Sequence, residues 1–283
     1  TSTVNMEMGR LKRTAFITLL VLLTSNLSLT IDFAGIVDLK TCIWGPSGSE
    51  ALLADDIIFL TDDIVVPEGI TLKILPGTKI VANYIHNPVL SADNLFNGLE
   101  ISIYGTLEAL GKSDNPIYFQ ALEPSRGIWQ GIFSLGTVKI EHAFIQDATA
   151  GVTSSGGQMQ LENCMLFNNQ TAIALWGWQI SKINKCSLTN NIDGIATAST
   201  PATITENVIE NNDVGIKILL GEVGPVIKNN TFLRNHTYHI YNLSVSDIIA
   251  YPNNWDLSFE QLEAKLFDGY REPEAGLILY REQ

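Results

Sequence analysis

The chain has 283 residues, of which 46% are hydrophobic, and its 30 acidic side chains outnumber the 17 basic ones, which gives a formal net charge of −13 at pH 7. An acidic surface excludes nucleic acid and polyanionic substrates as partners unless basic residues compensate locally. It is compatible with calcium, with a neutral glycan, or with solubility alone.

The first recognisable pattern is an export signal. Residues 8–34 begin with a basic cluster and continue with the apolar run Ala15–Leu23, which is too short to span a bilayer alone. We expect residues 1–34 to be a cleaved signal peptide, with an N-terminal membrane anchor as the alternative. The protein is then expected to be secreted, periplasmic or at the cell surface, and to contact a membrane only through this segment if it stays uncleaved.

The next segment, 35–56, is expected to cap the N-terminal end of the fold. Its stretch GPSGSEALLADD (45–56) is typical of a short helix. A cap is needed because a stack of β-strand repeats leaves open strand edges at its ends, and uncovered edges invite aggregation.

Five segments in the second half of the chain repeat one pattern: IEHAFIQDA, LENCMLFNN, INKCSLTNN, ITENVIENN and IKNNTFLRN. Their first residues are 21 to 23 positions apart: Ile140, Leu161, Ile183, Ile204 and Ile227. Apolar residues alternate within each segment, which is the period of a β-strand and not of a helix. A repeat of about 22 residues then holds three short strands and three turns, so we expect residues 57–250 to form a parallel β-helix, an all-β solenoid.

Asparagine pairs end most of these repeats. We expect Asn168, Asn190 and Asn211 to lie above one another in successive coils. An amide carries both a donor and an acceptor, so a stack can bond to itself and to the turn backbone. We therefore interpret the pairs as structural and not as a ligand-binding feature.

The last segment, 251–283, is expected to cap the C-terminal end with a helix near 258–267. Ser258 and Gln261 have the spacing of a capping box. The apolar residues that follow recur at helical spacing: Phe259, Leu262, Leu266 and Phe267.

Several stretches resemble a known family. VVPEGITLKILPGTKI (65–80), ISIYGTLEALGKSDNPIYFQA (101–121) and GIWQGIF (127–133) are similar to coil motifs of right-handed parallel β-helix proteins of the pectin-lyase-like superfamily, in particular the secreted or surface group with carbohydrate-binding and sugar-hydrolase-type repeats. The end of the chain, 253–280, resembles the helix-bearing end of such proteins. The resemblance implies a single-stranded right-handed β-helix over about 57–280, and it is weak for function because one fold hosts many functions.

Enzymes of the resembling family carry their site on the outer face of one strand ladder. Here the outward residues include Glu141 and Glu162, which coil stacking places about 5 Å apart, with Lys182 close by. That separation suits a retaining glycosidase. Neither the several carboxylates and the basic residue of a pectate-lyase-like calcium site nor the clustered aspartates of a polygalacturonase-like site are present, and a solvated mixed-charge ladder is the simpler interpretation.

The stretch ALWGWQ (174–179) is the most suggestive for binding. Trp176 and Trp178 lie on a turn before that ladder, where indole faces could stack against sugar rings. Gln160, Glu162 and Lys182 would then supply polar contacts. The alternative is that both indoles pack over neighbouring turns.

Cysteines and histidines give little sign of a metal centre. Cys164 and Cys186 occupy equivalent repeat positions and are expected to point inward as stacked small apolar residues, with a disulfide between them poorly angled. We interpret His142 as a turn residue, and His236 and His239 as surface or shoulder residues. No cofactor is expected. Calcium binding is kept as an alternative because acidic residues occur in pairs, such as Asp55/Asp56 and Asp62/Asp63. No loop has the spacing of a calcium-binding motif, however.

Two functional hypotheses follow. The first is a non-catalytic binding or scaffold module, with polysaccharide or a cell-surface glycan as the partner. The second is a polysaccharide lyase or glycoside hydrolase that works on the ladder face through Glu141, Glu162 and Lys182. Carboxylate number and geometry in one groove discriminate between them, and the sequence supplies only one pair.

Overall fold

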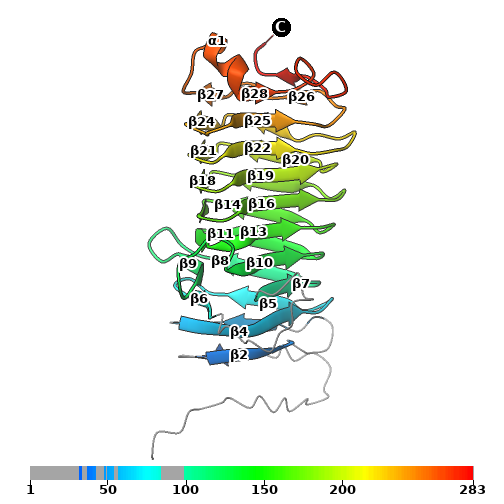
Figure 1. Ribbon diagram of the computed structural model, residues 1–283. Helices are drawn as coiled ribbons and strands as arrows, with labels where there is room; N and C mark the ends of the chain where they lie inside the picture. Colours follow the sequence, from blue (N-terminus) through cyan, green and yellow to red (C-terminus); the bar gives the residue numbers. More distant parts are fainter. Residues whose placement is uncertain are drawn as a thin grey trace, which may run out of the picture.

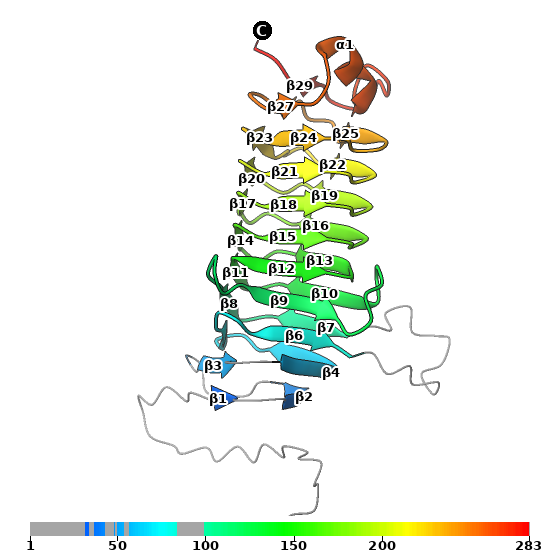
Figure 2. The same cartoon turned by 90° about the vertical axis from the view of Figure 1, so that its left-hand side faces the viewer.

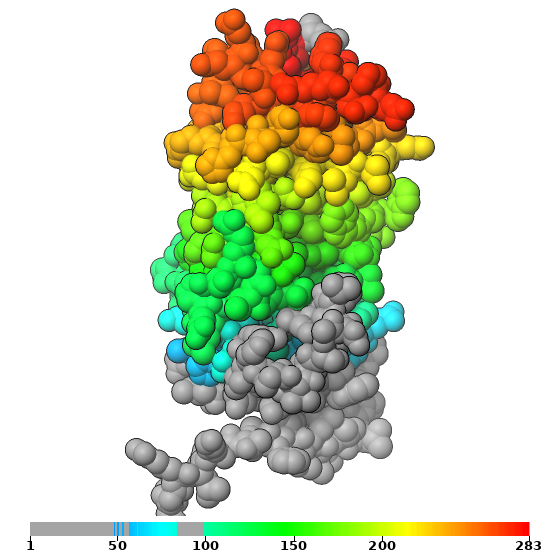
Figure 3. Space-filling model, in the orientation of Figure 1, coloured from blue at the N-terminus to red at the C-terminus, as the bar shows by residue number. Residues whose placement is uncertain are grey.

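A computed structural model describes residues 32–33, 37–42, 48, 50–53, 57–83 and 99–282. These residues form parallel coils stacked along one axis, with the C-terminal helix at one end (Figure 1). The same order is visible on the surface as successive bands (Figure 3). Within the described ranges, no helix has the length and apolar character needed to cross a membrane.

Three columns of strands run along the axis, and from β5 to β25 each coil contributes one strand to each column (Figure 2). The first column is the nine-stranded sheet β1 (Asp32–Phe33), β3 (Glu50–Leu53), β5 (Thr71–Ile74), β8 (Thr106–Leu110), β11 (Thr137–Glu141), β14 (Met159–Glu162), β17 (Ser181–Asn184), β20 (Ala202–Thr205) and β23 (Val226–Lys228). Every pairing within it is parallel.

The other two columns share one sheet, since β4 (Ile57–Val66) contributes to both. The second column continues with β6 (Lys79–Ala82), β9 (Ile117–Ala121), β12 (Ala143–Gln146), β15 (Met165–Phe167), β18 (Ser187–Thr189), β21 (Val208–Glu210), β24 (Thr231–Leu233) and β27 (Asn254–Trp255). The third column contains β2 (Val37–Cys42), β7 (Glu100–Ile103), β10 (Trp129–Ser134), β13 (Ala148–Ser154), β16 (Thr171–Trp176), β19 (Asp193–Ala198), β22 (Val214–Ile218), β25 (Tyr238–Asn242) and β28 (Leu266–Phe267).

The predicted repeat register is confirmed. Ile140, Leu161, Ile183, Ile204 and Ile227 pair in succession along the first column. All five are fully buried. Alternating residues of each strand thus enter one continuous apolar core, which is the main source of stability in such a stack.

The asparagine stack exists, but its members are the second residues of the pairs. The amide nitrogen Nδ2 of Asn169 donates to Oδ1 of Asn191 at 3.1 Å, Asn191 donates to Asn212 at 3.0 Å, and Asn212 donates to Asn235 at 3.1 Å. These side chains are buried, and we call them the amide ladder. Asn168, Asn190 and Asn211 follow residues that are in register in successive coils, as predicted, but they do not form the hydrogen-bonded ladder. They take positive φ angles of 54° to 56° at the turn itself, a conformation that asparagine tolerates.

A second amide ladder lies at the turn between the first and second columns. Asn207 donates to Asn230 at 2.9 Å, and Asn230 donates to Asn253 at 3.1 Å. Earlier coils have Cys164 and Cys186 at this position, both buried and both free thiols, as predicted. Each thiol lies within hydrogen-bonding distance of a backbone carbonyl oxygen, so cysteine and asparagine fill equivalent places.

The N-terminal helix expected in 45–56 is contradicted at Glu50–Leu53, which forms β3 and pairs in parallel with β5. The strand extends the coil stack instead, with Leu53 buried and in register with Ile74. Most of the expected leader, 1–34, and part of the expected cap, 35–56, lie outside the described residues. The division into leader, cap, β-helix (57–250) and C-terminal cap (251–283) therefore stays a prediction.

The C-terminal helix is present but shorter than predicted. It comprises α1 (Phe259–Leu262), with the predicted capping box at Ser258 and Gln261, followed by the 3-10 turn η1 (Glu263–Lys265). The helix does not continue through Leu266 and Phe267. These two residues form β28 and pair with the free edge of β25. The short strands β26 (Ile248–Ile249) and β29 (Ile278–Leu279) pair beside them.

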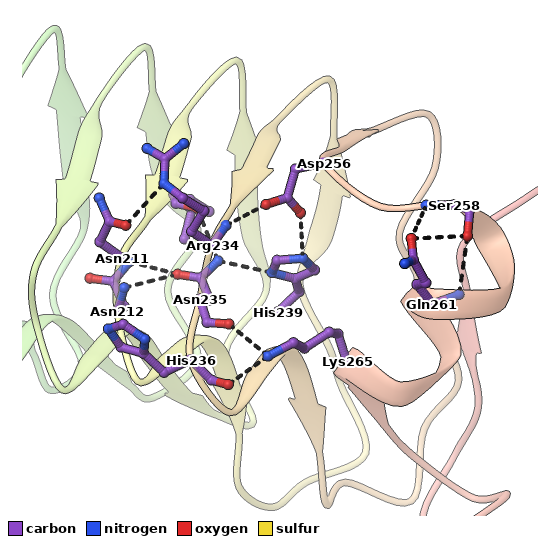
Figure 4. Close-up of polar contacts among 11 residues, drawn as sticks. Asn211, Asn212, Arg234, Asn235, His236, His239, Asp256, Ser258, Gln261 and Lys265 are labelled. Atoms are coloured by element: carbon purple, nitrogen blue, oxygen red, sulfur yellow. Dashed lines mark hydrogen bonds and ion pairs between the residues drawn. The ribbon is translucent and has the colours of Figure 1, made fainter.

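His239 ends the amide ladder, so its interpretation as a surface or shoulder residue was wrong (Figure 4). It is 1% exposed. Its Nδ1 lies 3.0 Å from Nδ2 of Asn235, and its Nε2 lies 3.1 Å from Oδ1 of Asp256. An amide nitrogen only donates, so Nδ1 accepts and Nε2 carries the proton. A neutral imidazole therefore closes the last coil.

This arrangement predicts a loss of stability in mild acid. Burial lowers the pKa of His239 below its ordinary value, against the opposing effect of Asp256. The unfolded state then binds more protons than the folded state once the pH falls below about 6.5, the ordinary pKa of histidine, so the free energy of unfolding decreases as the pH falls further. Urea unfolding midpoints measured between pH 7.5 and 5 should show the loss.

His239→Gln should reduce this acid dependence, because glutamine keeps an acceptor and a donor but does not titrate. The exposed neighbour provides a control: His236→Gln should leave the wild-type dependence intact. If the unfolding midpoint of His239→Gln depends on pH as that of the wild-type protein does, His239 is not the source of the acid dependence.

Candidate functional site

The candidate site predicted from sequence lies on the outer face of the first column. Two rows of outward side chains run along it in register. One row contains Lys73, Glu108, Lys139, Gln160, Lys182, Thr203 and Val226. The other contains Glu141, Glu162, Asn184, Thr205 and Lys228. We call these rows the polar face.

Ion pairs and hydrogen bonds link neighbours along the polar face. Lys139 contacts Glu141 at 3.0 Å, and Lys73 contacts Glu50 at 2.6 Å. Hydrogen bonding to these carboxylates raises the pKa of each lysine above its ordinary value. Their side chains are about one-third exposed, and such pairs contribute about 0–1 kcal/mol each. The face is therefore a solvated network of mixed charge.

Glu141 and Glu162 are direct neighbours in register. Parallel strands are about 4.8 Å apart, so the two carboxylates can approach the separation of a retaining glycosidase pair. Their partners differ, however. Glu141 pairs with Lys139, and Glu162 accepts a long hydrogen bond of 3.5 Å from Asn184. Both side chains are half-buried members of the solvated network of mixed charge, which is the simpler interpretation of the pair.

The other predicted polar residues lie beside this pair. Gln160 and Lys182 face each other in register on β14 and β17. Lys182 is exposed, while Gln160 and Glu162 are half-buried. The structure thus brings Gln160, Glu162 and Lys182 onto one small patch of two adjacent strands.

The two tryptophans differ in exposure. Trp176 ends β16, lies in register with Ala198 and is half-buried. Trp178 is in the turn that joins β16 to β17 and is 76% exposed. That turn leads into β17, the strand of the polar face that carries Lys182. Of these two tryptophans, only Trp178 presents an open indole.

Other coils expose apolar side chains on the same connection between the third and first columns. They are Tyr104, Leu135, Leu220 and Val245; Ile180 lies on the same turn as Trp178, and all five are between 46% and 70% exposed. Together with Trp178 we call them the apolar corner. A corner of this kind, beside a polar face along the same axis, can contact an extended ligand over several coils.

No described group of three or more His, Cys, Asp or Glu side chains is arranged to hold a metal ion. Of the acid pairs considered for calcium, Asp55/Asp56 lie outside the described residues. Asp63 uses Oδ1 to accept a hydrogen bond from the backbone of Glu100 at 2.9 Å.

Sequence reasoning missed one feature, a pocket of about 360 Å³ between the first and second columns. His142, Asn163 and Lys185 line it, and all three have positive φ angles of 48° to 53° at the turn that follows the first-column strand. The turn interpretation of His142 was correct. The repeat pattern could have revealed these lining residues, because His142, Asn163 and Lys185 each come directly before the equivalent positions Ala143, Cys164 and Cys186.

Comparison with known families supports the fold. A family model described as a right handed beta helix region matches residues 125–255, which covers the coils from β10 to β27. Neither the curated proteins nor the solved structures compared with the chain gave a significant match. The sequence match thus supports the β-helix fold.

Proposed function

We propose that this protein is a non-catalytic β-helix binding or scaffold module whose ligand is a neutral carbohydrate, and that it acts outside the cell or in the cell envelope. The observation that carries the proposal is the exposed indole of Trp178 on the turn that leads into β17, whose Lys182 forms a polar patch with Gln160 and Glu162. The basic and apolar leader pattern in 8–34 supports the location.

Carbohydrate suits this surface because a sugar ring has an apolar face and a polar edge. The face gains by covering the indole, whereas the hydroxyl groups need donors and acceptors close by. Lys182 donates, Glu162 accepts and Gln160 does both. Covering one indole stabilises binding by about 1–2 kcal/mol, so single contacts are weak and an extended chain along the apolar corner would bind by summing them.

Trp178→Ala is expected to weaken binding about tenfold, which corresponds to the loss of about 1.4 kcal/mol. Titration of neutral oligosaccharides followed by intrinsic fluorescence measures this. Trp176→Ala should have a smaller effect because Trp176 is half-buried.

Tyr270→Ala is the matched control, since Tyr270 is 84% exposed but lies on the C-terminal cap after β28. The proposal is wrong if Trp178→Ala binds as tightly as the wild-type protein, or if Tyr270→Ala weakens binding equally.

The alternative is a polysaccharide lyase or glycoside hydrolase that uses Glu141, Glu162 and Lys182. The direct register of the two glutamates favours it, and their place in a solvated network of mixed charge argues against it. Incubation with polysaccharides followed by assays for reducing and unsaturated ends separates the two hypotheses. New ends that disappear in Glu141→Gln or Glu162→Gln would establish the enzyme.

A further inference from the structure

The pocket between the first and second columns is a distinct site with its own chemistry. It has a volume of about 360 Å³, within the range of small-molecule sites. Figure 2 shows the coils on which it lies, where β11 leads into β12 and β14 leads into β15. Its lining combines the polar residues Lys112, His142, Asn163 and Lys185 with an apolar wall that includes Phe144 and Met165.

The backbone fixes the polar residues. His142, Asn163 and Lys185 occupy the same turn in successive coils, where the backbone N–H of His142 donates to the Glu162 carbonyl and that of Asn163 donates to the Asn184 carbonyl. The left-handed conformation is unfavourable for histidine and lysine, so the stack holds them at some cost. Lys112 comes from the β8–β9 loop, which a bridge between Lys112 and Asn115 closes.

The pocket concentrates positive charge on an acidic protein. Lys112 and Lys185 both line it, and neither takes part in an ion pair among the described residues. No carboxylate belongs to its lining, although Glu206 follows Lys185 in the column of turn residues. His142 and Asn163 add side chains that can donate hydrogen bonds. This is the local compensation that an anionic ligand requires.

The apolar wall suits a flat ring. Phe144 stacks on Tyr118 with ring centroids 5.0 Å apart, which holds it in place. Met165 is 37% exposed and offers a polarisable sulfur, which favours aromatic contacts. Burial raises the pKa of the Cys164 thiol well above its ordinary value, so this lining thiol stays neutral and unreactive.

We propose that this pocket binds a small aromatic anion, with the ring against Phe144 and Met165 and the carboxylate or phosphate between Lys112 and Lys185. The site is separate from the polar face and from Trp178, so it does not depend on the proposed carbohydrate function. Charge-assisted hydrogen bonds from two ammonium groups would dominate the affinity.

Methionine methyl resonances provide a local test, since the chain has only four methionines. In protein with ¹³C-labelled methionine methyl groups, phenyl phosphate and benzoate should shift the Met165 resonance, which Met165→Leu assigns. Met159, 1% exposed, should not respond. Whichever of the two probes binds more tightly identifies the anionic group, and neutral benzyl alcohol should bind at least about fivefold more weakly than that probe.

Lys112→Gln and Lys185→Gln should each weaken binding of that probe about tenfold. Lys228→Gln removes the same charge from the polar face and should leave the affinity unchanged. The proposal is overturned if neither anion shifts the Met165 resonance, if benzyl alcohol binds as well as the anions, or if the lysine variants bind like the wild-type protein. Neutral oligosaccharide titrations should be unaltered in Lys185→Gln, which keeps the two sites distinguishable.

Discussion

Replacing Asn191 with leucine is expected to lower the free energy of unfolding by about 3–5 kcal/mol, because several buried polar groups lose their partners at once. Nδ2 of Asn191 donates to the carbonyl oxygens of Leu166 and Thr189 and to Oδ1 of Asn212. Its own Oδ1 accepts from the backbone and side chain of Asn169. Leucine can replace none of these contacts, and water cannot reach the site, since Asn191 is 1% exposed.

The neighbour Asn190 is the control for this substitution. It is exposed and has a φ angle of 56°, so Asn190→Gly keeps the turn and should change stability by less than about 1 kcal/mol. Chemical denaturation of both variants tests the amide ladder. Equal midpoints for Asn191→Leu and the wild-type protein would show that the ladder does not stabilise the stack.

Gly131→Ala is expected to destabilise the fold by about 3–5 kcal/mol, from backbone strain and from overlap with the next coil. Gly131 has a φ angle of 103°, and a β-carbon there would lie 1.7 Å from the carbonyl oxygen of Ala150. It lies where the register between β10 and β13 shifts. The strands cannot separate at this point without breaking their pairing.

Gly156→Ala separates the two contributions. Gly156 also has a positive φ angle, 120°, but the nearest atom to its added β-carbon is 3.9 Å away. Strain alone should cost about 1–2 kcal/mol at this position. Thermal or urea denaturation should therefore show that Gly131→Ala is much less stable than Gly156→Ala. Equal losses of stability in the two variants would contradict the close approach of the coils at Gly131.

The strand register could be predicted from sequence because period-two alternation and the 21- to 23-residue repeat both depend on the apolar core. The sequence predicted a hydrogen-bonded stack of asparagine side chains, but the ladder is formed by the second residue of each pair and not by the first. Both members of a pair such as Asn168 and Asn169 are compatible with a turn, and only the backbone dihedral angles decide which one points inward. The burial of His239 could not be predicted, since it depends on a partner, Asp256, that the cap supplies.

The candidate site shows the same division. The neighbours Glu141 and Glu162 followed from the repeat alone, and their register is confirmed. The difference in exposure between Trp176 and Trp178 depends on the path of one turn. The part that Lys112 has in the pocket was not predictable, because Lys112 comes from a loop that precedes the regular repeats. Residues within the repeat are placed by pattern, and residues from loops are not.

The central claim is that the surface around Trp178 binds neutral carbohydrate without turnover. A glycan array probed with the full chain and with the double variant Trp176→Ala/Trp178→Ala tests it most directly. The account predicts that the wild-type protein is retained on neutral glycans and that the double variant is lost from them, while its unfolding midpoint stays close to that of the wild-type protein. Retention of the double variant on the same glycans, or no retention of the wild-type protein on any of them, would contradict the account.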